Sequence, residues 1–349
     1  MSVKQTSVFI PSGAGAPGFG GIYHCLKQDP NTVVHAGDQN AQSYGFGLAD
    51  FAVKVPASNH PEYIPFILEY CSKHSIDVLL PITTRELEPL SESAHLFEQI
   101  GTEVIVSQID GLKIANNKFL VLKHAQMHGI AVPDFKQVFD FCELNEYCTL
   151  RFESGESKQC FKPIIGNGSR GFGVVVQVVD SNFLNEKSAW MPLTLDEWGQ
   201  RMGRDKFITP ILVSDFLDGI EYSVDVLVQN NAIRYCIPRR RDKMIGGISV
   251  TGVIENNEEL IDLTTKLVKS LNLTGPIGVQ WKYDSHGIPK LLEINPRLQG
   301  TTSACVLAGV NIPLDAIKCA TCSEFEPLNS VVWGTTFTRY WSDINPKII

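Results

Sequence analysis

Residues 278–297 read GVQWKYDSHGIPKLLEINPR, and this stretch predicts a β-hairpin. Two largely apolar runs flank the polar tetrapeptide Asp284-Ser-His-Gly287. That arrangement is typical of two antiparallel strands joined by a short turn. If the turn closes between its first and last residues, Gln280 lies opposite Leu291.

One face of this hairpin carries three oxygen-bearing side chains. Because side chains alternate between the faces of a strand, Gln280, Glu293 and Asn295 are expected on the same side. Such groups are costly to bury without a partner. Mg²⁺ prefers oxygen ligands and leaves positions for phosphates, so the three residues are candidate metal ligands. Arg297 can pair with a phosphate oxygen. The alternative is a strand whose polar side faces solvent.

A glycine-rich segment supplies a second candidate phosphate site. Lys162-Pro163 ends a predicted strand and is followed by Gly166-Asn-Gly-Ser-Arg-Gly-Phe-Gly173. Backbone N–H groups in such a loop can bind phosphates, and Lys162 adds a positive charge. The segment lacks the GxxxxGK[ST] pattern and enters a strand, so it is not a P-loop. A glycine-rich hairpin without a ligand is the alternative.

Strands and helices alternate in the first part of the chain, which predicts a parallel, helix-covered sheet up to about residue 112. The expected strands are 7–10, 32–36, 77–81, 103–107, 159–163, 174–179, 211–217, 221–228, 233–237, 278–283 and 288–295. The expected helices are 22–27, 61–74, 85–99, 113–129, 256–271 and about 302–322.

Length and composition limit the class of protein. The chain has 349 residues, of which 44% are hydrophobic and 19% charged, as expected for two or three globular domains. A net charge of −8 without a basic run argues against binding to nucleic acid or to a membrane surface. No apolar stretch has the length of a spanning helix, and the N-terminus lacks a signal-like segment. The expected location is the cytoplasm. The nine scattered cysteines are expected to be reduced and buried.

The order of the polar motifs is more specific than any one of them. Lys118 heads a predicted helix, Lys162 precedes the glycine loop, Ser214–Asp225 follows, and Glu293-Ile-Asn-Pro-Arg297 comes last. This order resembles the ATP-grasp superfamily, in particular one half of the carbamoyl-phosphate synthase large subunit. The resemblance covers almost the whole chain.

The resemblance implies an α/β fold. A Rossmann-like, parallel-sheet pre-ATP-grasp domain is expected at residues 1–112. A two-lobed α+β ATP-grasp module follows, with its small lobe and glycine loop at 113–217 and its large lobe at 218–349. ATP is expected between the two lobes.

The resemblance also implies roles for individual residues. Residues 166–173 match the mobile loop that closes over the triphosphate, and residues 214–217 match a linker whose backbone contacts adenine. Glu221 matches the acidic residue on the ribose hydroxyls. Many relatives have Glu-Glu or Glu-Lys where this chain has Ser214-Asp215, a change that a backbone contact tolerates. The implied ATP-binding residues are Lys118, Lys162, Gly168, Ser169, Gly171, Asp215, Phe216, Leu217 and Glu221.

The same comparison assigns the chemical groups. Gln280, Glu293 and Asn295 match the family's metal ligands, which the hairpin's face indicates independently. Lys162 and Arg297 are the implied catalytic residues, with Arg297 neutralising the transferring phosphate. Arg239-Arg240-Arg241 reads by itself as a solvated run. Because the matching segment borders the substrate cleft, Arg239 and Arg241 are candidates for an anionic substrate, an acyl phosphate or the γ-phosphate.

The activity that the resemblance implies is ATP-dependent ligation of a small carboxylate to a small amine through an acyl phosphate. The cofactors are ATP and Mg²⁺, with Mn²⁺ as a possible substitute, and a homodimer is a possible assembly. Carbamoyl-phosphate synthesis is not expected as the whole activity, because the synthase uses two such halves and an ammonia-supplying subunit.

Two other functions stay open. Gly13-Ala-Gly15-Ala-Pro-Gly18 follows a predicted strand, and Asp38 ends the next one, which fits a dinucleotide fingerprint and an NAD(P)-dependent oxidoreductase. Pro17 inside the turn and the glycine turns of pre-ATP-grasp domains argue against this reading. The third possibility is a non-catalytic nucleotide-binding protein, which the complete set of Lys, Gln, Glu, Asn and Arg residues disfavours.

Overall fold

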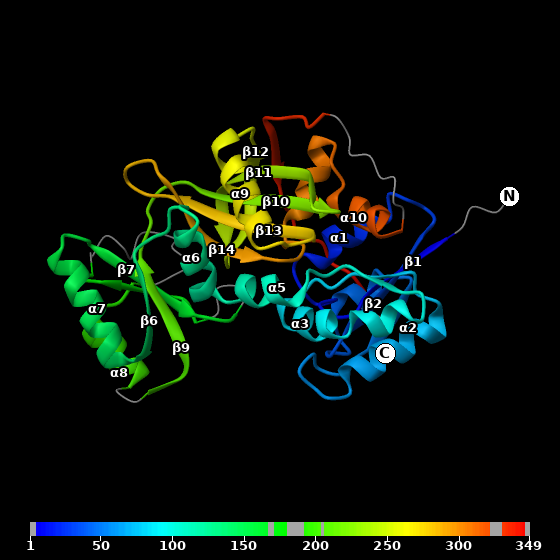
Figure 1. Ribbon diagram of the computed structural model, residues 1–349, viewed down its shortest axis with the longest axis horizontal. Helices are drawn as coiled ribbons and strands as arrows, with labels where there is room; N and C mark the ends of the chain where they lie inside the picture. The colour runs from blue at the N-terminus through cyan, green and yellow to red at the C-terminus, as the bar shows by residue number, and fades with distance from the viewer. Residues whose placement is uncertain (1–4, 167–170, 180–191, 204–205, 322–329, 346–349) are drawn as a thin grey trace.

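Three β-sheets organise the computed structural model (Figure 1). It describes residues 5–166, 171–179, 192–203, 206–321 and 330–345. One sheet is parallel and two are antiparallel, and helices cover each of them. The mixed α/β class expected from the sequence is confirmed.

The parallel sheet is buried on both faces. Its strands run in the order β3-β2-β1-β4-β5. On β1, Val8 and Ile10 pack with helix α1 (Phe19–Leu26), while Phe9 packs on the opposite face with α2 (Tyr63–His74). Burial on both faces explains why the strand is a continuous apolar run. The strand bounds are β1 Thr6–Ile10, β2 Thr32–Asp38, β3 Phe51–Lys54, β4 Val78–Leu79 and β5 Glu103–Val104.

The second sheet is antiparallel, has the order β6-β9-β7-β8, and lies at the left of Figure 1. Helices α7 (Phe141–Glu153) and α8 (Leu195–Met202) pack on it through a small core that includes Leu144, Phe161 and Val213. The strand bounds are β6 Phe135–Asp140, β7 Lys158–Pro163, β8 Gly173–Val176 and β9 Lys206–Asp215.

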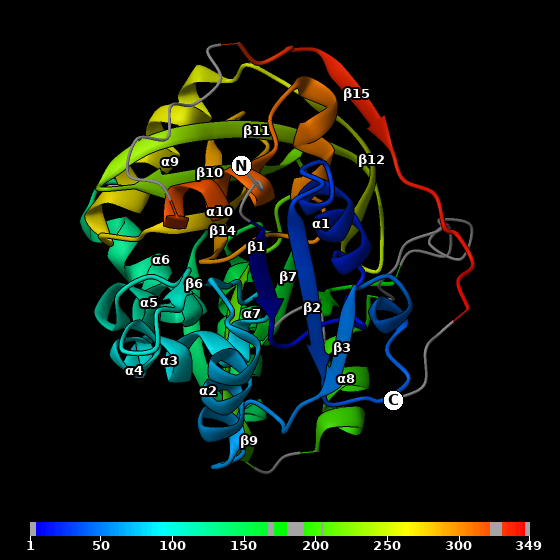
Figure 2. The ribbon, with the colours of Figure 1, turned by 90° about the vertical axis from the view of Figure 1, so that its right-hand side faces the viewer.

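The third sheet, also antiparallel, has the order β14-β13-β10-β11-β12-β15. One face, with Val224 and Trp281, packs against α9 (Glu258–Ser270), α5 (Ile109–Asn116) and α6 (Lys118–Met127). Figure 2 shows β15 beside β12 at the outer edge. The strand bounds are β10 Glu221–Gln229, β11 Ala232–Ile245, β12 Ile248–Ile254, β13 Gly275–Tyr283, β14 Pro289–Asn295 and β15 Thr335–Thr338.

The opposite face of the third sheet changes character along its strands. At one end, Leu227 and Ile237 share a hydrophobic core with α1 and with α10 (Ile312–Thr321), so the first and third sheets are joined there. Towards the other end, the residues on the same face are polar, beginning with Asp225 and Arg239. The boundary between core and polar surface therefore crosses the sheet at Arg239.

Three helices expected as single elements are each divided. Residues 85–99 form α3 (Thr84–Glu92) and α4 (Ala94–Glu98). The helix expected at 113–129 is interrupted at Asn117, whose side chain caps α6. The helix expected at 302–322 is a 3-10 helix, η3 (Thr302–Ala308), followed by α10, because Gly309 adopts a left-handed conformation between them.

The register of the β13–β14 hairpin also differs from the expectation. Gln280 lies opposite Glu293, not opposite Leu291, which pairs with Trp281. The backbone N–H of Asp284 bonds to the carbonyl of Ile288, so the turn is one residue longer than expected. A β-bulge at Leu292 shifts the pairing by a further residue.

The division into residues 1–112, 113–217 and 218–349 stays a proposal. The second boundary falls between β9 and β10, where the chain passes from one sheet to the next. The first boundary falls inside α5. Within the described residues, no single helix could cross a membrane; η3 and α10, bent by 97°, meet the length and composition test only as a pair. Both contribute buried side chains to the core between the first and third sheets.

Candidate active site

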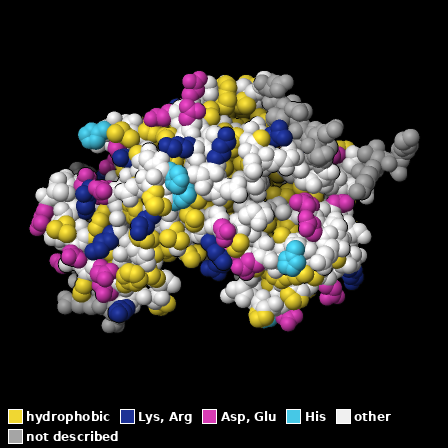
Figure 3. Space-filling model, in the orientation of Figure 1, with side chains coloured by type: hydrophobic (Ala, Val, Ile, Leu, Met, Phe, Trp, Pro, Cys, Tyr) yellow, Lys and Arg dark blue, Asp and Glu magenta, His cyan; other side chains and the backbone are white. Residues whose placement is uncertain are grey.

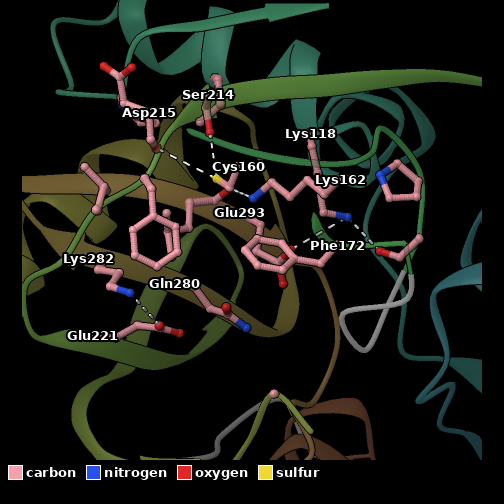
Figure 4. Close-up of a pocket in the computed structure, with 18 of the residues that line it drawn as sticks. Lys118, Cys160, Lys162, Phe172, Ser214, Asp215, Glu221, Gln280, Lys282 and Glu293 are labelled. Carbon is pink, nitrogen blue, oxygen red and sulfur yellow. Dashed lines mark hydrogen bonds and ion pairs between the residues drawn. The ribbon is translucent and has the colours of Figure 1, made fainter. Parts of the chain in front are cut away.

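A cleft with a volume of about 260 Å³ lies between the second and third sheets. Strands β7 and β9 supply one wall, and β10, β11, β13 and β14 supply the other (Figure 4). The sequence-predicted residues that line it are Lys118, Lys162, Asp215, Phe216, Leu217, Glu221, Arg241, Gln280 and Glu293.

Lys118 is positioned by the start of helix α6. Asn117 precedes the helix, and its side-chain oxygen accepts hydrogen bonds from two N–H groups of the first turn. The Nζ of Lys118 donates to the carbonyl of Gly166 at 2.7 Å and lies 3.7 Å from Oε2 of Glu293. Burial lowers the pKa of Lys118, and the neighbouring Glu293 opposes this effect.

Glu293 faces several positive charges. Lys118 and Lys162 lie side by side above it (Figure 4). Burial disfavours the charged carboxylate, but the attraction of Lys118, Lys162 and Arg297 and a hydrogen bond from Asn295 outweigh burial, so the pKa of Glu293 is lowered. The carboxylate is therefore ionised at neutral pH, as metal binding requires.

The bulge at Leu292 builds the polar face of the hairpin. Without it, the expected alternation after Leu291 would turn Glu293 towards the core. The extra residue instead places Glu293 beside Gln280, on the cleft side. It also leaves the Leu292 carbonyl free of the ladder, where it accepts a hydrogen bond from Nζ of Lys162 at 3.2 Å.

Arg297 is held from both the third and the first sheet regions. Its Nη2 donates to Oδ1 of Asn295 at 3.0 Å, and its Nε donates to Oγ1 of Thr84 at 3.0 Å. Thr84 is the first residue of α3, in the N-terminal region. Asn295 in turn donates to Oε1 of Glu293 at 3.0 Å. Neither Asn295 nor Arg297 lines the cleft itself, but both are linked to it through Glu293.

The segment between the lobes presents its backbone to the cleft. The carboxylate of Asp215 is bound by Arg151, with Nε at 2.8 Å and Nη2 at 2.5 Å. Arg151 comes from α7, so the side chain of Asp215 is held on the small-lobe side. Phe216 lies beneath the cations of Lys158 and Lys282, 5.7 and 5.0 Å from its ring centre. This geometry suits a contact with adenine through the backbone.

Glu221, predicted on the ribose, is paired with two cations in this structure. Arg241 contacts one carboxylate oxygen, and Nζ of Lys282 lies 3.8 Å from the other. Arg241 also donates to the carbonyl of Gly247 at 2.5 Å and reaches Oε1 of Gln280 at 3.4 Å. A nucleotide that used Glu221 would have to replace part of this network.

Two further predicted residues, Gly171 and Arg239, lie outside the cleft wall. Gly171 is exposed beside it, whereas Gly168 and Ser169 lie outside the described residues. Arg239 is fully buried and paired with Asp225, so it does not line the cleft.

Sequence reasoning missed Lys282 and Cys160, which both line the cleft. A signal for each exists in the alternation of strands: Lys282 is two residues beyond Gln280, and Cys160 two residues before Lys162. Burial raises the pKa of Cys160, so its thiol is neutral and is not an activated nucleophile.

The donor set of the hairpin fits a hard cation. Gln280 and Glu293 offer side-chain oxygens from paired positions at the cleft, one of them charged. The side-chain oxygen of Asn295 accepts from Arg297 in this structure, so Asn295 would have to exchange this contact to act as a third ligand. Within the described part of the chain, no group of three His, Cys, Asp or Glu residues is suited to a metal. A carboxylate with amide oxygens is a donor set that Mg²⁺ accepts.

The N-terminal glycine turn packs against residues 300–303, which follow strand β14 in the chain. A Cβ on Gly18 would lie 2.7 Å from the Cα of Gly300, and one on Gly21 would lie 2.3 Å from Oγ of Ser303. Asp38 accepts a hydrogen bond from the N–H of Gly15 at 2.9 Å. These contacts account for the glycines and the aspartate by packing, and they favour that role over dinucleotide binding.

Two family models match separate parts of the chain. A model described as "ATP-grasp in the biosynthetic pathway with Ter operon" matches residues 207–336. A second, described as "PylC-like, N-terminal domain", matches residues 22–105. The chain contains an ATP-grasp domain. The ATP-grasp match includes the candidate metal ligands and Glu221. It also includes Arg239 and Arg241, the candidate substrate-binding residues. No curated protein matches the sequence significantly.

Solved structures with the same fold cover most of this ATP-grasp protein. An L-amino acid ligase from Bacillus licheniformis has a TM-score of 0.65 at 16% identity, covering 93% of this chain and 77% of its own. N5-carboxyaminoimidazole synthetase from Staphylococcus aureus, complexed with ADP, has a TM-score of 0.69 at 13% identity, covering 95% and 81%.

A third ATP-grasp neighbour contains a metal salt of the nucleotide. It is the biotin carboxylase domain dimer of 2-oxoglutarate carboxylase from Hydrogenobacter thermophilus, in complex with MgADP, ADP and bicarbonate. Its TM-score is 0.64 at 15% identity, covering 96% of this chain and 74% of its own. At these identities, the three neighbours establish the fold that the sequence motifs suggested.

Proposed function

We propose that this ATP-grasp protein is a carboxylate–amine ligase that forms an amide with release of ADP and phosphate. The observation that carries the proposal is the convergence of Lys118 and Lys162 on Glu293, beside Gln280 and next to a backbone hinge. Positive charge and a carboxylate–amide oxygen set are what a nucleotide triphosphate with its metal needs. The similar structures of an L-amino acid ligase and of an N5-carboxyaminoimidazole synthetase support the same class.

The proposed reaction has two steps. A carboxylate oxygen of the first substrate attacks the γ-phosphorus of ATP, and ADP leaves. The amine of the second substrate then attacks the acyl carbon, phosphate leaves, and the nitrogen loses a proton. Phosphoryl transfer needs mainly positioning and neutralisation of charge, so no covalent enzyme nucleophile is required.

This chain's residues supply that neutralisation. Lys118 and Lys162 would bind phosphate oxygens, and Arg297 would stabilise the charge of the transferring group. Gln280, Glu293 and Asn295 would hold Mg²⁺, which supplies Lewis-acid polarisation of the phosphates when bound. The backbone of residues 215–217 would contact adenine, and Glu221 the ribose. A homodimer, like the dimeric domain among the neighbours, fits the proposal.

A binding experiment and a turnover experiment test the proposed function. Mg-ATP at about 100 times its dissociation constant should stabilise the protein by about 2.7 kcal/mol, read as a raised thermal midpoint, and NADH should not. ADP and phosphate release should then be measured over a panel of carboxylates and amines, with mass analysis of the products. A shift with NADH and none with Mg-ATP would overturn the ligase assignment.

A further inference from the structure

Arg239 has an unusual environment for a buried arginine. It is 0% exposed, and Asp225 pairs with its Nε. Both terminal nitrogens, Nη1 and Nη2, are buried without a hydrogen-bond partner among the described residues. The guanidinium lies over the ring of Phe337, 5.9 Å from its centre, which offers no acceptor oxygen. An unpartnered guanidinium edge is costly, so an absent acceptor is implied.

A second arginine reaches the same place. Arg339 follows Phe337 by two residues on the extension of β15, where its N–H bonds to the carbonyl of Val250. Its Nη2 donates to the carbonyl of Pro17 at 2.8 Å, and no carboxylate pairs with it among the described residues. Arg239 lies over the ring of Phe337, and Arg339 is on the same side of this extended segment two residues later. Burial lowers the pKa of Arg339; Tyr44 opposes this effect, and the positive charge of Arg239 adds to it.

The charges in this cluster do not balance. Asp225 compensates one positive charge, while Arg239 and Arg339 together carry two. Gln299 adds a further buried nitrogen, Nε2, without a partner. It is connected to the cluster through Thr302, whose hydroxyl accepts from the N–H of Gln299 at 3.0 Å and donates to Asp225 at 2.5 Å. The missing group is thus an oxygen acceptor that carries negative charge.

The cluster lies at a fixed distance from the phosphate end of the cleft. Arg239, Ser223, Gln280 and Glu293 form one row across strands β11, β10, β13 and β14. One strand separates the backbones of Arg239 and Gln280, so they are about 10 Å apart. An anion bound by Arg239 would therefore lie on the Ser223 side of Gln280 and Glu293.

We propose that Arg239 and Arg339 bind the α-carboxylate of an amino-acid acceptor, whose amine is thereby directed towards the acyl phosphate over Ser223. This inference rests on the proposed ligase function. The two free nitrogens of Arg239 match the two oxygens of a carboxylate. In this structure the two terminal nitrogens of Arg239 are closed to solvent. Arg339 is less buried, so the amino acid would approach from the side of Arg339.

The test compares acceptors that differ only in this group. With the carboxylate substrate from the turnover panel held at a saturating concentration, ADP release is measured with each of the common L-amino acids, with the corresponding amino-acid amides, and with phosphoethanolamine as the amine. Wild type should respond to at least one free amino acid at a KM about 10- to 100-fold lower than that of its amide, since a charge-assisted contact is lost. Arg339→Gln should raise the KM of the amino acid and so reduce the difference between the KM values of the amino acid and its amide, here called the gap. The KM of ATP should be unchanged.

Two further variants separate recognition from folding. Arg239→Lys keeps a charge for Asp225 but removes the planar edge, so it should also narrow the gap. Arg240→Gln is the matched control: Arg240 lies on the opposite face, paired with Glu255 and Asp242, and should leave both KM values unchanged.

Several results would contradict the carboxylate site. A response only to amides, only to phosphoethanolamine, or to no member of the panel would overturn it, as would an unchanged gap in Arg339→Gln. In each case, stabilisation by Mg-ATP and ATP-dependent ligation of other amines would leave the proposed function standing. Failure of Mg-ATP to bind would overturn the proposed function itself.

Discussion

Individual residues around Glu293 show how one carboxylate can be prepared for two tasks. Asn295 donates to one of its oxygens, and Lys118 lies 3.7 Å from the other. Together with Lys162, these groups keep the pKa of Glu293 low in spite of its burial. The same carboxylate thus attracts Lys118 and Lys162, the proposed phosphate-binding lysines, and remains available as an anionic ligand.

Replacement of Glu293 tests this arrangement. Glu293→Gln preserves volume but removes the charge that Lys118 and the metal share. We expect ATP-dependent turnover to fall by about 100-fold or more, the scale of losing about 3 kcal/mol of transition-state stabilisation. The thermal midpoint should change by only a few degrees. Steady-state kinetics and thermal unfolding measure both, with Glu258→Gln, an exposed position on α9, as control. Near-normal turnover would show that Glu293 is not a ligand.

A buried carboxyl in the N-terminal region gives a pH-dependent prediction. Burial raises the pKa of Glu86 from 4.5 to about 7, although it accepts hydrogen bonds from Tyr63 and from the N–H groups of Ile82 and Thr83. Between these pH values the folded protein holds a proton that the unfolded chain releases. The stability that Glu86 contributes is therefore full below pH 4.5 and is lost as the pH rises to 7.

The expected loss is about 3 kcal/mol over this range, from about 1.4 kcal/mol per pKa unit. Urea unfolding of wild type and of Glu86→Gln at pH 4.5, 5.5 and 7 measures it. The difference in the free energy of unfolding, wild type minus variant, should decline with pH. A difference that stays constant would mean that Glu86 titrates normally.

At the scale of elements, an ion pair between α7 and the end of β9 holds residues 215–217, the segment that leads from the second sheet to the third and is called the hinge below. Arg151 binds Asp215 with two hydrogen bonds and Asp134 at 3.0 Å, so helix α7, the end of β9 and the residue before β6 are tied together. The hinge backbone is thereby held at the cleft while its carboxylate is used elsewhere. A nucleotide would therefore contact the backbone of this segment and not the side chain of Asp215.

Asp215→Asn distinguishes these two roles. It keeps the backbone and the shape but weakens the ion pair with Arg151, which is partly shielded from solvent. We expect a loss of about 2 kcal/mol in unfolding free energy and less than about threefold change in the KM of ATP. Arg151→Met should act in the same way. A large rise in the KM of ATP without loss of stability would instead place the carboxylate on the nucleotide.

At the scale of the whole molecule, the N-terminal region and the third sheet act as one support for the site. They share a hydrophobic core, and Thr84 of the first region bonds to Arg297 of the third. Their backbones approach each other closely at Gly18 and Gly300. On the face seen in Figure 3, basic and acidic side chains are interspersed, which agrees with small-molecule substrates.

A methyl group at this approach should disturb both stability and catalysis. Gly18→Ala would place Cβ 2.7 Å from the Cα of Gly300, so the two regions must separate slightly. We expect a cost of about 1–3 kcal/mol and a lower kcat, because Arg297 loses its position relative to Thr84. Gly20→Ala is the matched control. Gly20 also lies in helix α1, and the nearest atom to its added Cβ, in Leu48, would be 3.6 Å away. Equal stability and kcat in both variants would refute the role of this contact.

Local features of the sequence were sufficient to predict much of this protein. The apolar run at 7–10 predicts a buried strand. The spacing of Glu293 and Asn295 indicates their common face. These features depend on apolar runs and on alternation, which act over a few residues and are therefore visible in one sequence.

Other features were decided only by tertiary structure. The bulge at Leu292 sets which residue faces Gln280, because core packing on one side outweighs the regular ladder. Arg239 and Arg241 lie two residues apart on strand β11, so alternation alone predicts the same face for both. Arg239 is buried against Asp225, whereas Arg241 lines the cleft. The boundary of the hydrophobic core passes between them, and its position depends on contacts with α1 and α10, far away in the chain. Burial of this kind is a property of the packed molecule, so no local pattern encodes it.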